Sequence, residues 1–121
     1  MAIEVLAVDD SRTMRDMVCA ALVPSGFTVH TAEDGVQGIE VLQTITPDAI
    51  ITDINMPRLD GFGFIEAVRR DQQHRAVPIL VLTTEGSDTL RQKAREAGAT
   101  GWIVKPFDPG KLIRALYLVA G

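Results

Sequence analysis

Residues 49–53 read AIITD, a short run of strand-forming side chains that ends in a carboxylate. Four more short, mainly apolar runs occur along the chain: Ile3–Val8, Thr28–Ala32, Ile79–Leu82 and Trp102–Val104. Short apolar runs bounded by polar residues are typical of strands. Because all but the second run are almost wholly apolar, we expect parallel strands that helices cover on both faces.

The segments between these runs have the periodicity of helices with one buried face. Apolar residues recur at three- and four-residue spacing in Thr13–Val23, Val36–Thr44, Phe62–Arg70, Thr89–Ala97 and Lys111–Val119. We expect Pro24 to cut the first helix short. Gly26 and Gly98 suit helix ends, while Asp108 followed by Pro109 suits a helix start. The pattern therefore predicts five βα units and an α/β fold.

Five βα units with right-handed crossovers have few possible arrangements. The doubly wound, flavodoxin-like parallel sheet with strand order 2-1-3-4-5 is the one that we predict. In this architecture ligands bind outside the carboxyl ends of the strands, where the winding direction reverses between strands one and three. The topology thus predicts where a functional site lies.

The length of 121 residues and the 46% of hydrophobic residues fit one domain, residues 1–121, with no output domain. No apolar stretch is long enough to cross a membrane, and no leader precedes the first strand, so we expect a cytoplasmic protein without a membrane partner. The lone Cys19 cannot form an internal disulfide, which suits a reducing compartment.

The charge is unevenly distributed along the chain. Residues 1–85 hold 13 acidic and 6 basic side chains, whereas residues 86–121 hold 3 acidic and 6 basic ones. The acidic amino-terminal part argues against nucleic acid as a partner and is compatible with a cation site, although ordinary surface variation is an alternative.

Polar side chains follow four of the five predicted strands. Asp9 and Asp10 follow the first, Asp53 the third, Thr83 the fourth and Lys105 the fifth. One such residue is ordinary, because strands must exit to solvent, but four at one edge indicate a site. Three close carboxylates repel one another, and an all-oxygen set of this kind suits Mg²⁺.

The residue types at this edge favour phosphoryl transfer. Lys105 and Thr83 offer a positive charge and a hydroxyl to phosphoryl oxygens. A carboxylate beside Mg²⁺ and a lysine can attack phosphorus and form an acyl phosphate. We expect Asp53 to be this nucleophile because it stands alone on the central strand.

The same residues resemble the signature of response-regulator receiver domains, over essentially the whole chain. The matching pieces are Asp9-Asp10, Asp53-Ile54-Asn55-Met56-Pro57 with Asp60-Gly61, Thr83, and Lys105-Pro106-Phe107. The resemblance implies that Asp53 accepts a phosphoryl group from a sensor histidine kinase. It also implies that the protein is not an enzyme, although it catalyses its own phosphorylation and dephosphorylation.

The resemblance assigns further roles around the phosphoacceptor. Mg²⁺ would be held by Asp10, by Asp53 and by the backbone carbonyl of Asn55, with Asp9 acting through water. Thr83 and Lys105 would contact the phosphoryl oxygens, and the bond from Lys105 to Pro106 would be cis.

Four positions near the site bear on switching and on the lifetime of the phosphoryl group. Trp102 stands where the family usually has a tyrosine or phenylalanine that moves with Thr83, so we expect it to report activation; a half-buried indole with its N–H at the surface is the alternative. The bulk of Thr84 would hinder small phosphodonors. Asn55 and Glu85 resemble the residues of chemotaxis receivers that dephosphorylate within seconds to minutes, although Glu85 could instead serve as a favourable charge at a helix start.

The resemblance also implies an output face on the fourth helix, the fifth strand and the fifth helix. Its candidate residues are Arg91, Lys93, Arg95, Trp102 and Lys111, with Arg114 beside them. A basic face suits an acidic partner segment; an ordinary solvated helix face is the alternative. We expect a monomeric chemotaxis receiver that takes phosphate from a CheA-like kinase and binds the flagellar motor switch.

Three other functions remain as alternatives. A phosphate sink or a phosphorelay intermediate would have the same domain. A magnesium-dependent phosphohydrolase of the haloacid-dehalogenase type requires a second aspartate where Asn55 stands. Flavin binding requires a glycine- and hydroxyl-rich loop after the first strand, where Asp9 and Asp10 would repel a phosphate.

Overall fold

Five parallel strands lie in the order β2-β1-β3-β4-β5, as the sequence predicted. The computed structural model describes residues 2–121, and Met1 lies outside them. In chain order the elements are β1 (Glu4–Val8), α1 (Arg12–Leu22), the 3-10 turn η1 (Val23–Ser25), β2 (Thr28–Ala32), α2 (Gly35–Leu42), β3 (Ala49–Thr52), α3 (Gly61–Arg70), β4 (Ile79–Thr83), α4 (Asp88–Ala97), β5 (Gly101–Val104) and α5 (Pro109–Ala120). The predicted flavodoxin-like α/β fold is confirmed.

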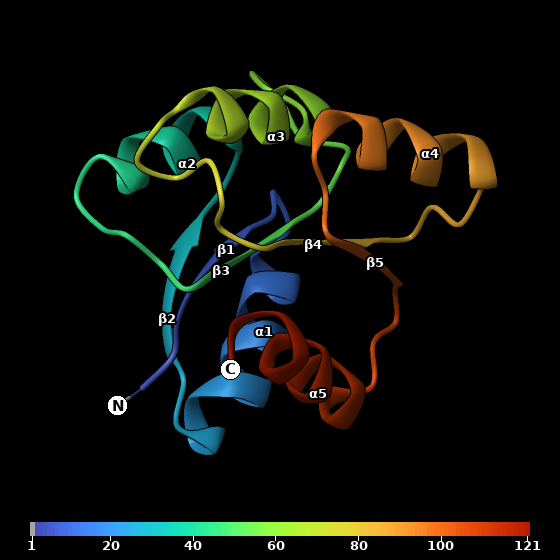
Figure 1. Ribbon diagram of the computed structural model, residues 1–121. Helices are drawn as coiled ribbons and strands as arrows, with labels where there is room; N and C mark the ends of the chain where they lie inside the picture. The colour runs from blue at the N-terminus through green and yellow to red at the C-terminus, as the bar shows by residue number, and fades with distance from the viewer. Residues whose placement is uncertain (1) are drawn as a thin grey trace.

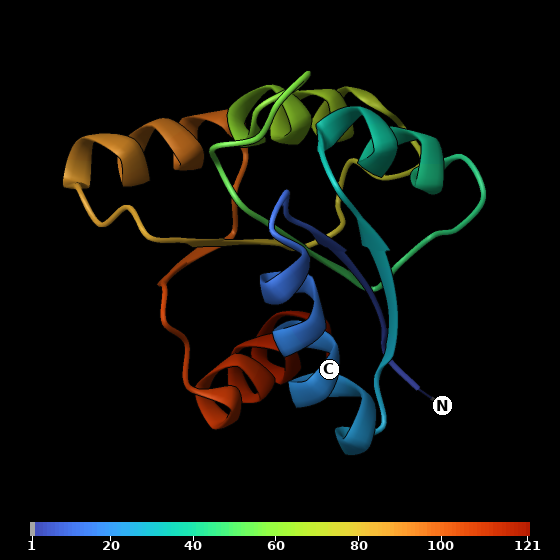
Figure 2. The same cartoon turned by 180° about the vertical axis from the view of Figure 1, so that it is seen from behind.

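The sheet separates two layers of helices. Helices α2, α3 and α4 cover one face, and α1 and α5 cover the other (Figures 1 and 2). In β1, Leu6 and Val8 belong to the core under the first layer, whereas Val5 and Ala7 belong to the core under the second. Both sides of the strand are therefore buried from Val5 to Val8, which explains why these four positions are all apolar.

The predicted helix boundaries are confirmed where they depend on local chemistry. The carboxylate of Asp108 caps α5 by accepting a hydrogen bond from the backbone N–H of Lys111, and Pro109 is the first residue of that helix. Pro24 lies in η1, so α1 ends at Leu22. Gly98 ends α4 with a φ of 119°, a conformation that favours glycine.

The edge strand β5 packs on both faces, with Trp102 against the core under one helix layer and Ile103 against the core under the other, but it is less deeply buried than we expected. None of its four residues is fully buried, and Val104 is exposed. The reason is that β5 pairs only with β4.

Within residues 2–121, no helix is long and apolar enough to span a membrane.

Candidate functional site

The three predicted carboxylates meet at the carboxyl ends of β1 and β3. These strands pair in parallel with Val8 opposite Thr52, so the residues that follow them emerge side by side. Asp9, Asp10 and Asp53 each offer a carboxylate oxygen, and these oxygens lie within 4.8 Å of one another. Asp9 and Asp53 are buried, whereas Asp10 is exposed. One side of the cluster therefore remains open to solvent.

Lys105 reaches this cluster from the far edge of the sheet. Its Nζ donates to Oδ2 of Asp9 at 2.8 Å and to Oδ2 of Asp53 at 3.0 Å. The backbone N–H of Lys105 donates to the carbonyl of Thr83 at 2.7 Å, which continues the pairing of β4 with β5. The bond from Lys105 to Pro106 is cis, as the resemblance implied.

The ionisation of the site reflects both burial and pairing. Burial raises the pKa of Asp9, although hydrogen bonds from Lys105 and from the backbone N–H of Ser11 act in the opposite direction. Burial by itself would lower the pKa of Lys105, but its hydrogen bonds to Asp9 and Asp53 outweigh burial, and the pKa is raised. One ammonium group thus faces three carboxylates, and the remaining negative charge suits a cation.

The carboxylate of Asp53 is held by both of its oxygens. Oδ1 accepts a hydrogen bond from the backbone N–H of Ile54 at 2.7 Å, and Oδ2 accepts the bond from Lys105. The backbone N–H of Asp53 donates to the carbonyl of Val8 at 3.0 Å. A buried carboxylate with a fixed orientation is suited to attack an electrophile that enters from the open side.

The motif residues Asp60 and Gly61 have structural roles. Asp60 caps α3 by accepting a hydrogen bond from the backbone N–H of Gly63 at 2.8 Å. Gly61 has no room for a Cβ, which would contact the carbonyl of Asp53, and its N–H donates to the carbonyl of Ile54 at 2.8 Å. The loop between β3 and α3 is therefore closed at its base, directly after the phosphoacceptor candidate.

Thr83 and Trp102 both contact the loop that follows β4. The hydroxyl of Thr83 accepts a hydrogen bond from the backbone N–H of Glu85 at 3.4 Å, and Thr83 is fully buried. The indole N–H of Trp102 donates to the carbonyl of Glu85 at 2.9 Å. The indole N–H is therefore satisfied by a backbone carbonyl of the protein and not by solvent at the surface. Sequence patterns do not predict this link, because it joins positions 17 residues apart through the backbone.

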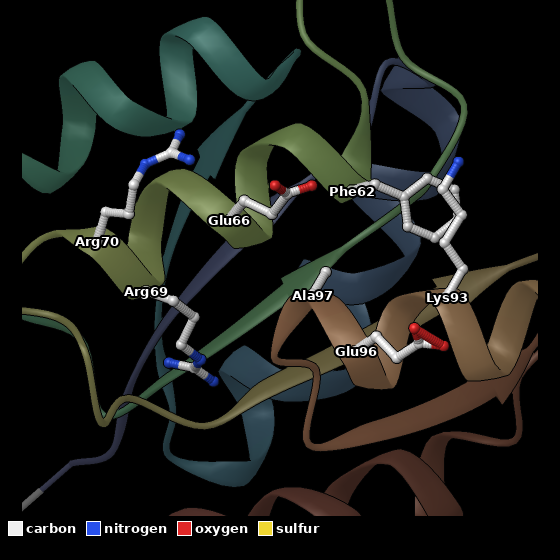
Figure 3. Close-up of a pocket in the computed structure, with 7 residues that line it drawn as sticks. All are labelled: Phe62, Glu66, Arg69, Arg70, Lys93, Glu96 and Ala97. Carbon is white, nitrogen blue, oxygen red and sulfur yellow. The ribbon is translucent and has the colours of Figure 1, made fainter.

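The predicted output residues divide between two sides of α4. Arg91, Arg95 and Trp102 line one groove beside β5. Lys93 lies on the side that faces α3, with its Nζ 4.4 Å from the centre of the Phe62 ring (Figure 3). That second groove, between α3 and α4, contains none of the clustered carboxylates. The structure therefore separates Lys93 from the predicted output residues Arg91 and Arg95, while Lys111 is exposed on α5.

Two arginines near the site were not predicted. Nη1 of Arg15 donates to the backbone carbonyl of Asp9 at 2.7 Å, which ties α1 to the end of β1. Arg58, in the loop after Asp53, pairs with Asp34. Neither Arg15 nor Arg58 directly follows a strand, so the pattern of polar residues at strand ends does not indicate them.

Comparisons with known proteins agree with this arrangement. A model of the response regulator receiver domain matches residues 5–117. The probable chemotaxis protein CheY of Rhizobium etli is 37% identical over 120 residues, which cover 98% of this chain and 93% of that protein. The solved structure of the chemotaxis protein CheY4 of Vibrio cholerae has a TM-score of 0.94 and 45% identity, and the match covers 98% of this chain and 99% of that one.

A third similar structure holds a metal. The receiver domain of a sensor histidine kinase from Pseudomonas aeruginosa, with a magnesium ion coordinated in its active site cleft, has a TM-score of 0.92 and 30% identity, with 100% of this chain and 99% of that one covered. Other relatives are longer, and this chain spans 7% of one and 45% of another.

The chain belongs to the response regulator receiver family. It is a receiver domain of two-component signalling, and it resembles chemotaxis proteins of the CheY kind along nearly its whole length. Receiver domains are signalling proteins rather than conventional enzymes.

Proposed function

We propose that this receiver is switched on by phosphorylation of Asp53, with a sensor histidine kinase as the phosphodonor. The observation that carries the proposal is the contact of Lys105 with Asp9 and Asp53 beside the exposed Asp10. This arrangement combines an oriented nucleophile, a fixed positive charge and an excess of negative charge that suits a divalent cation.

The donor set fits Mg²⁺. Asp10, Asp53 and the backbone carbonyl of Asn55 would bind it directly, and Asp9 would act through water, an all-oxygen set of the type that Mg²⁺ prefers. When bound there, Mg²⁺ would supply positive charge that offsets the carboxylates and the phosphoryl oxygens. The similar kinase receiver with magnesium in its cleft supports this assignment.

The residues of the chain supply the remaining parts of the reaction. One carboxylate oxygen of Asp53 forms a bond to phosphorus, the bond from phosphorus to the kinase imidazole breaks, and the imidazole nitrogen keeps the bonding electron pair. The N–H of Ile54 holds the other oxygen of Asp53, and Lys105 transfers its hydrogen bonds to the phosphoryl group.

Activation would reach the surface through Thr83. Its hydroxyl bonds to the N–H of Glu85, and Glu85 is also bonded to Trp102. If the hydroxyl turns toward a phosphoryl group on Asp53, the Glu85 contact is lost, and the groove of Arg91, Arg95 and Trp102 changes. That groove, with Lys111 on α5, is the output face that we propose.

For the biological role we propose chemotaxis, with a CheA-like kinase as donor and the flagellar motor switch as target in the cytoplasm. The similarity to CheY and CheY4 over nearly the full length of each supports this choice. Asn55 and Glu85 flank the site, and we propose that they allow dephosphorylation within seconds to minutes. Stable binding of the phosphorylated protein to the switch protein supports a motor role; rapid transfer to a second histidine would instead indicate a phosphate sink or relay.

The test is phosphotransfer from labelled histidine kinases in the presence of Mg²⁺. We expect the wild-type protein to acquire label and Asp53→Asn to acquire none. Asp48→Asn is the matched control, because Asp48 is an exposed aspartate at the opposite end of β3. Label that survives in Asp53→Asn would overturn the assignment. The emission of Trp102, the single tryptophan, should change on phosphorylation.

A further inference from the structure

Arg58 has an unusual backbone conformation in the loop that follows Asp53. Its φ is 66°, and it is the one non-glycine residue with positive φ among residues 2–121. This left-handed conformation is unfavourable for a residue with a long side chain. A residue keeps such a conformation when its surroundings hold it there, and such positions concentrate at functional sites.

The side chain of Arg58 makes a two-point ion pair with Asp34. Nε lies 2.7 Å from Oδ2 of Asp34, and Nη2 lies 3.1 Å from Oδ1. The Asp34 side chain is only 4% exposed. Arg58 is the largest cause that lowers the pKa of Asp34. Two parallel charge-assisted bonds to a buried carboxylate restrict orientation far more than an ordinary surface pair does.

Asp34 is itself fixed. It caps α2 by accepting a hydrogen bond from the backbone N–H of Gln37 at 2.8 Å. Next to it, the N–H of Gly35 donates to the carbonyl of Leu59 at 3.3 Å, and a Cβ on Gly35 would lie 2.7 Å from that oxygen. The start of α2 therefore holds the backbone of the loop at Arg58 and Leu59.

Asn55 lies between two anchors. The hydrogen bond from Gly61 to the carbonyl of Ile54 closes the base of the loop, and the pair of Arg58 with Asp34 holds its far side. The direction of the Asn55 carbonyl therefore depends on the backbone path between these anchors. Within residues 2–121, the side-chain hydrogen-bond partners of Asp34 are Gln37 and Arg58, and Asp34 belongs to the connection between β2 and α2.

We propose that Arg58 and Asp34 are a positioning pair that holds the β3–α3 loop so that the Asn55 carbonyl can bind Mg²⁺. The inference rests on the proposed function, because it requires that carbonyl to be a metal ligand. Neither residue touches the reacting atoms. The pair acts on metal affinity, and it acts on phosphorylation only through the metal.

The test is the Mg²⁺ dissociation constant, measured by titration calorimetry. Asp34→Asn keeps a side-chain oxygen for the helix cap but removes the charge, and Arg58→Asn tolerates the left-handed backbone but removes the pair. We expect each variant to bind Mg²⁺ about tenfold more weakly, and the double variant no more weakly than the singles. Arg75→Asn, which removes an exposed arginine at the other end of the molecule, should bind as the wild type does.

The direction of the change separates positioning from simple charge effects. Loss of a nearby positive charge should strengthen Mg²⁺ binding, and loss of a negative charge should weaken it. Positioning predicts weaker binding in both variants. Arg58→Lys keeps the charge and loses the two-point geometry, so it should also weaken binding. Saturating Mg²⁺ should restore the phosphorylation rate of every variant, a rescue that a folding defect would not show.

Two outcomes would overturn the proposal, and they are distinguishable. If the wild-type protein binds Mg²⁺ and the Arg58 and Asp34 variants bind it equally well, or change in opposite directions, the pair does not position the loop. If the wild-type protein does not bind Mg²⁺, the proposed function fails and takes the positioning role with it. Thermal melts of each variant establish that folded protein is compared.

Discussion

The two ends of the sheet both hold charged or polar side chains that are buried or half-buried, but their bonding partners differ. At the carboxyl ends of β1, β3 and β5, Lys105 faces Asp9, Asp10 and Asp53, and the negative charges outnumber the positive one. At the amino ends of β3, β4 and β5, the half-buried guanidinium of Arg69 and the buried imidazole of His74 bond mainly to backbone carbonyls. The first arrangement leaves carboxylate oxygens for a cation, whereas in the second the N–H donors are taken up by backbone carbonyls.

Arg69 is the centre of the amino-terminal arrangement. Its Nε donates to the carbonyl of Gly98 at 2.9 Å, and its Nη1 donates to the carbonyls of Arg75 at 3.0 Å and Val77 at 2.7 Å. Burial lowers the pKa of Arg69. These bonds join the end of α3 to the start of β4 and to the end of α4, so the guanidinium connects three elements.

His74 completes this end of the sheet. Its ring is 1% exposed and lies between Oδ2 of Asp71, 2.9 Å from Nδ1, and the carbonyl of Ile45, 3.1 Å from Nε2. Each polar atom of the ring thus has a protein partner. Burial of polar side chains by itself therefore does not mark a functional site. A group of carboxylates that outnumbers its one ammonium partner, beside a side open to solvent, is what indicates a cation site.

The largest expected effect comes from removing the cation at the carboxyl end. Lys105→Met should slow phosphorylation of Asp53 about 100-fold, because a fixed positive charge at the phosphoryl group is lost. The same substitution should strengthen Mg²⁺ binding about tenfold, because the ammonium no longer competes for the carboxylates. Phosphotransfer rates and calorimetry measure the two effects.

Lys111→Met is the matched control for that prediction, since Lys111 is exposed on α5. Weaker Mg²⁺ binding in Lys105→Met would contradict the view that excess negative charge defines the carboxyl end.

Removing the cation at the amino end should affect stability instead. Arg69→Met leaves carbonyls at the start of β4 and the end of α4 without their donor, and we expect the free energy of unfolding to fall by about 2 kcal/mol. Urea denaturation measures this. Arg70→Met, the exposed neighbour in α3, should change it by less than about 0.5 kcal/mol. A change in Mg²⁺ affinity in folded Arg69→Met would show that the two ends are not independent.

The smallest expected effect is a pH dependence at the amino end. The hydrogen bond with His74 is the largest cause that lowers the pKa of Asp71 from its ordinary value of 3.8. A carboxyl group with a lowered pKa stabilises the fold above its ordinary pKa, and the stability is lost as pH falls through the lower value. The melting temperature of the wild type should therefore exceed that of Asp71→Asn at about pH 6, and the difference should shrink below pH 3.8. A difference that stays constant would contradict the assignment.

Much of the carboxyl end could be predicted from the sequence. The strands are short, apolar and evenly spaced, and parallel strands place their carboxyl ends at one edge, so Asp9, Asp53 and Lys105 were expected to meet. The cis bond before Pro106 and the cap at Asp108 followed from the resemblance and from local chemistry. These features depend on residues close in the sequence or on a topology with few alternatives.

The amino end could not be predicted in the same way. Arg69 and His74 lie in a helix and a loop, and their partners are carbonyls of Gly98, Val77 and Ile45, which every sequence would supply. The same limit applies to Trp102 with Glu85. Any residue can accept a hydrogen bond through its backbone carbonyl, so the type of the acceptor residue does not reveal such a bond.

The sequence by itself therefore determined the five βα units, and it indicated the edge of the sheet where Asp9, Asp10 and Asp53 cluster. Periodicity and strand ends are local properties of the sequence. In a parallel doubly wound sheet, the residues that follow the strands lie at the same edge of the sheet. Only the tertiary structure decided that Lys93 lies toward α3, that Arg58 is held by Asp34, and that Arg69 and His74 at the amino end bond mainly to backbone carbonyls. Those outcomes depend on distances between segments far apart in the chain, which packing sets and residue order does not reveal.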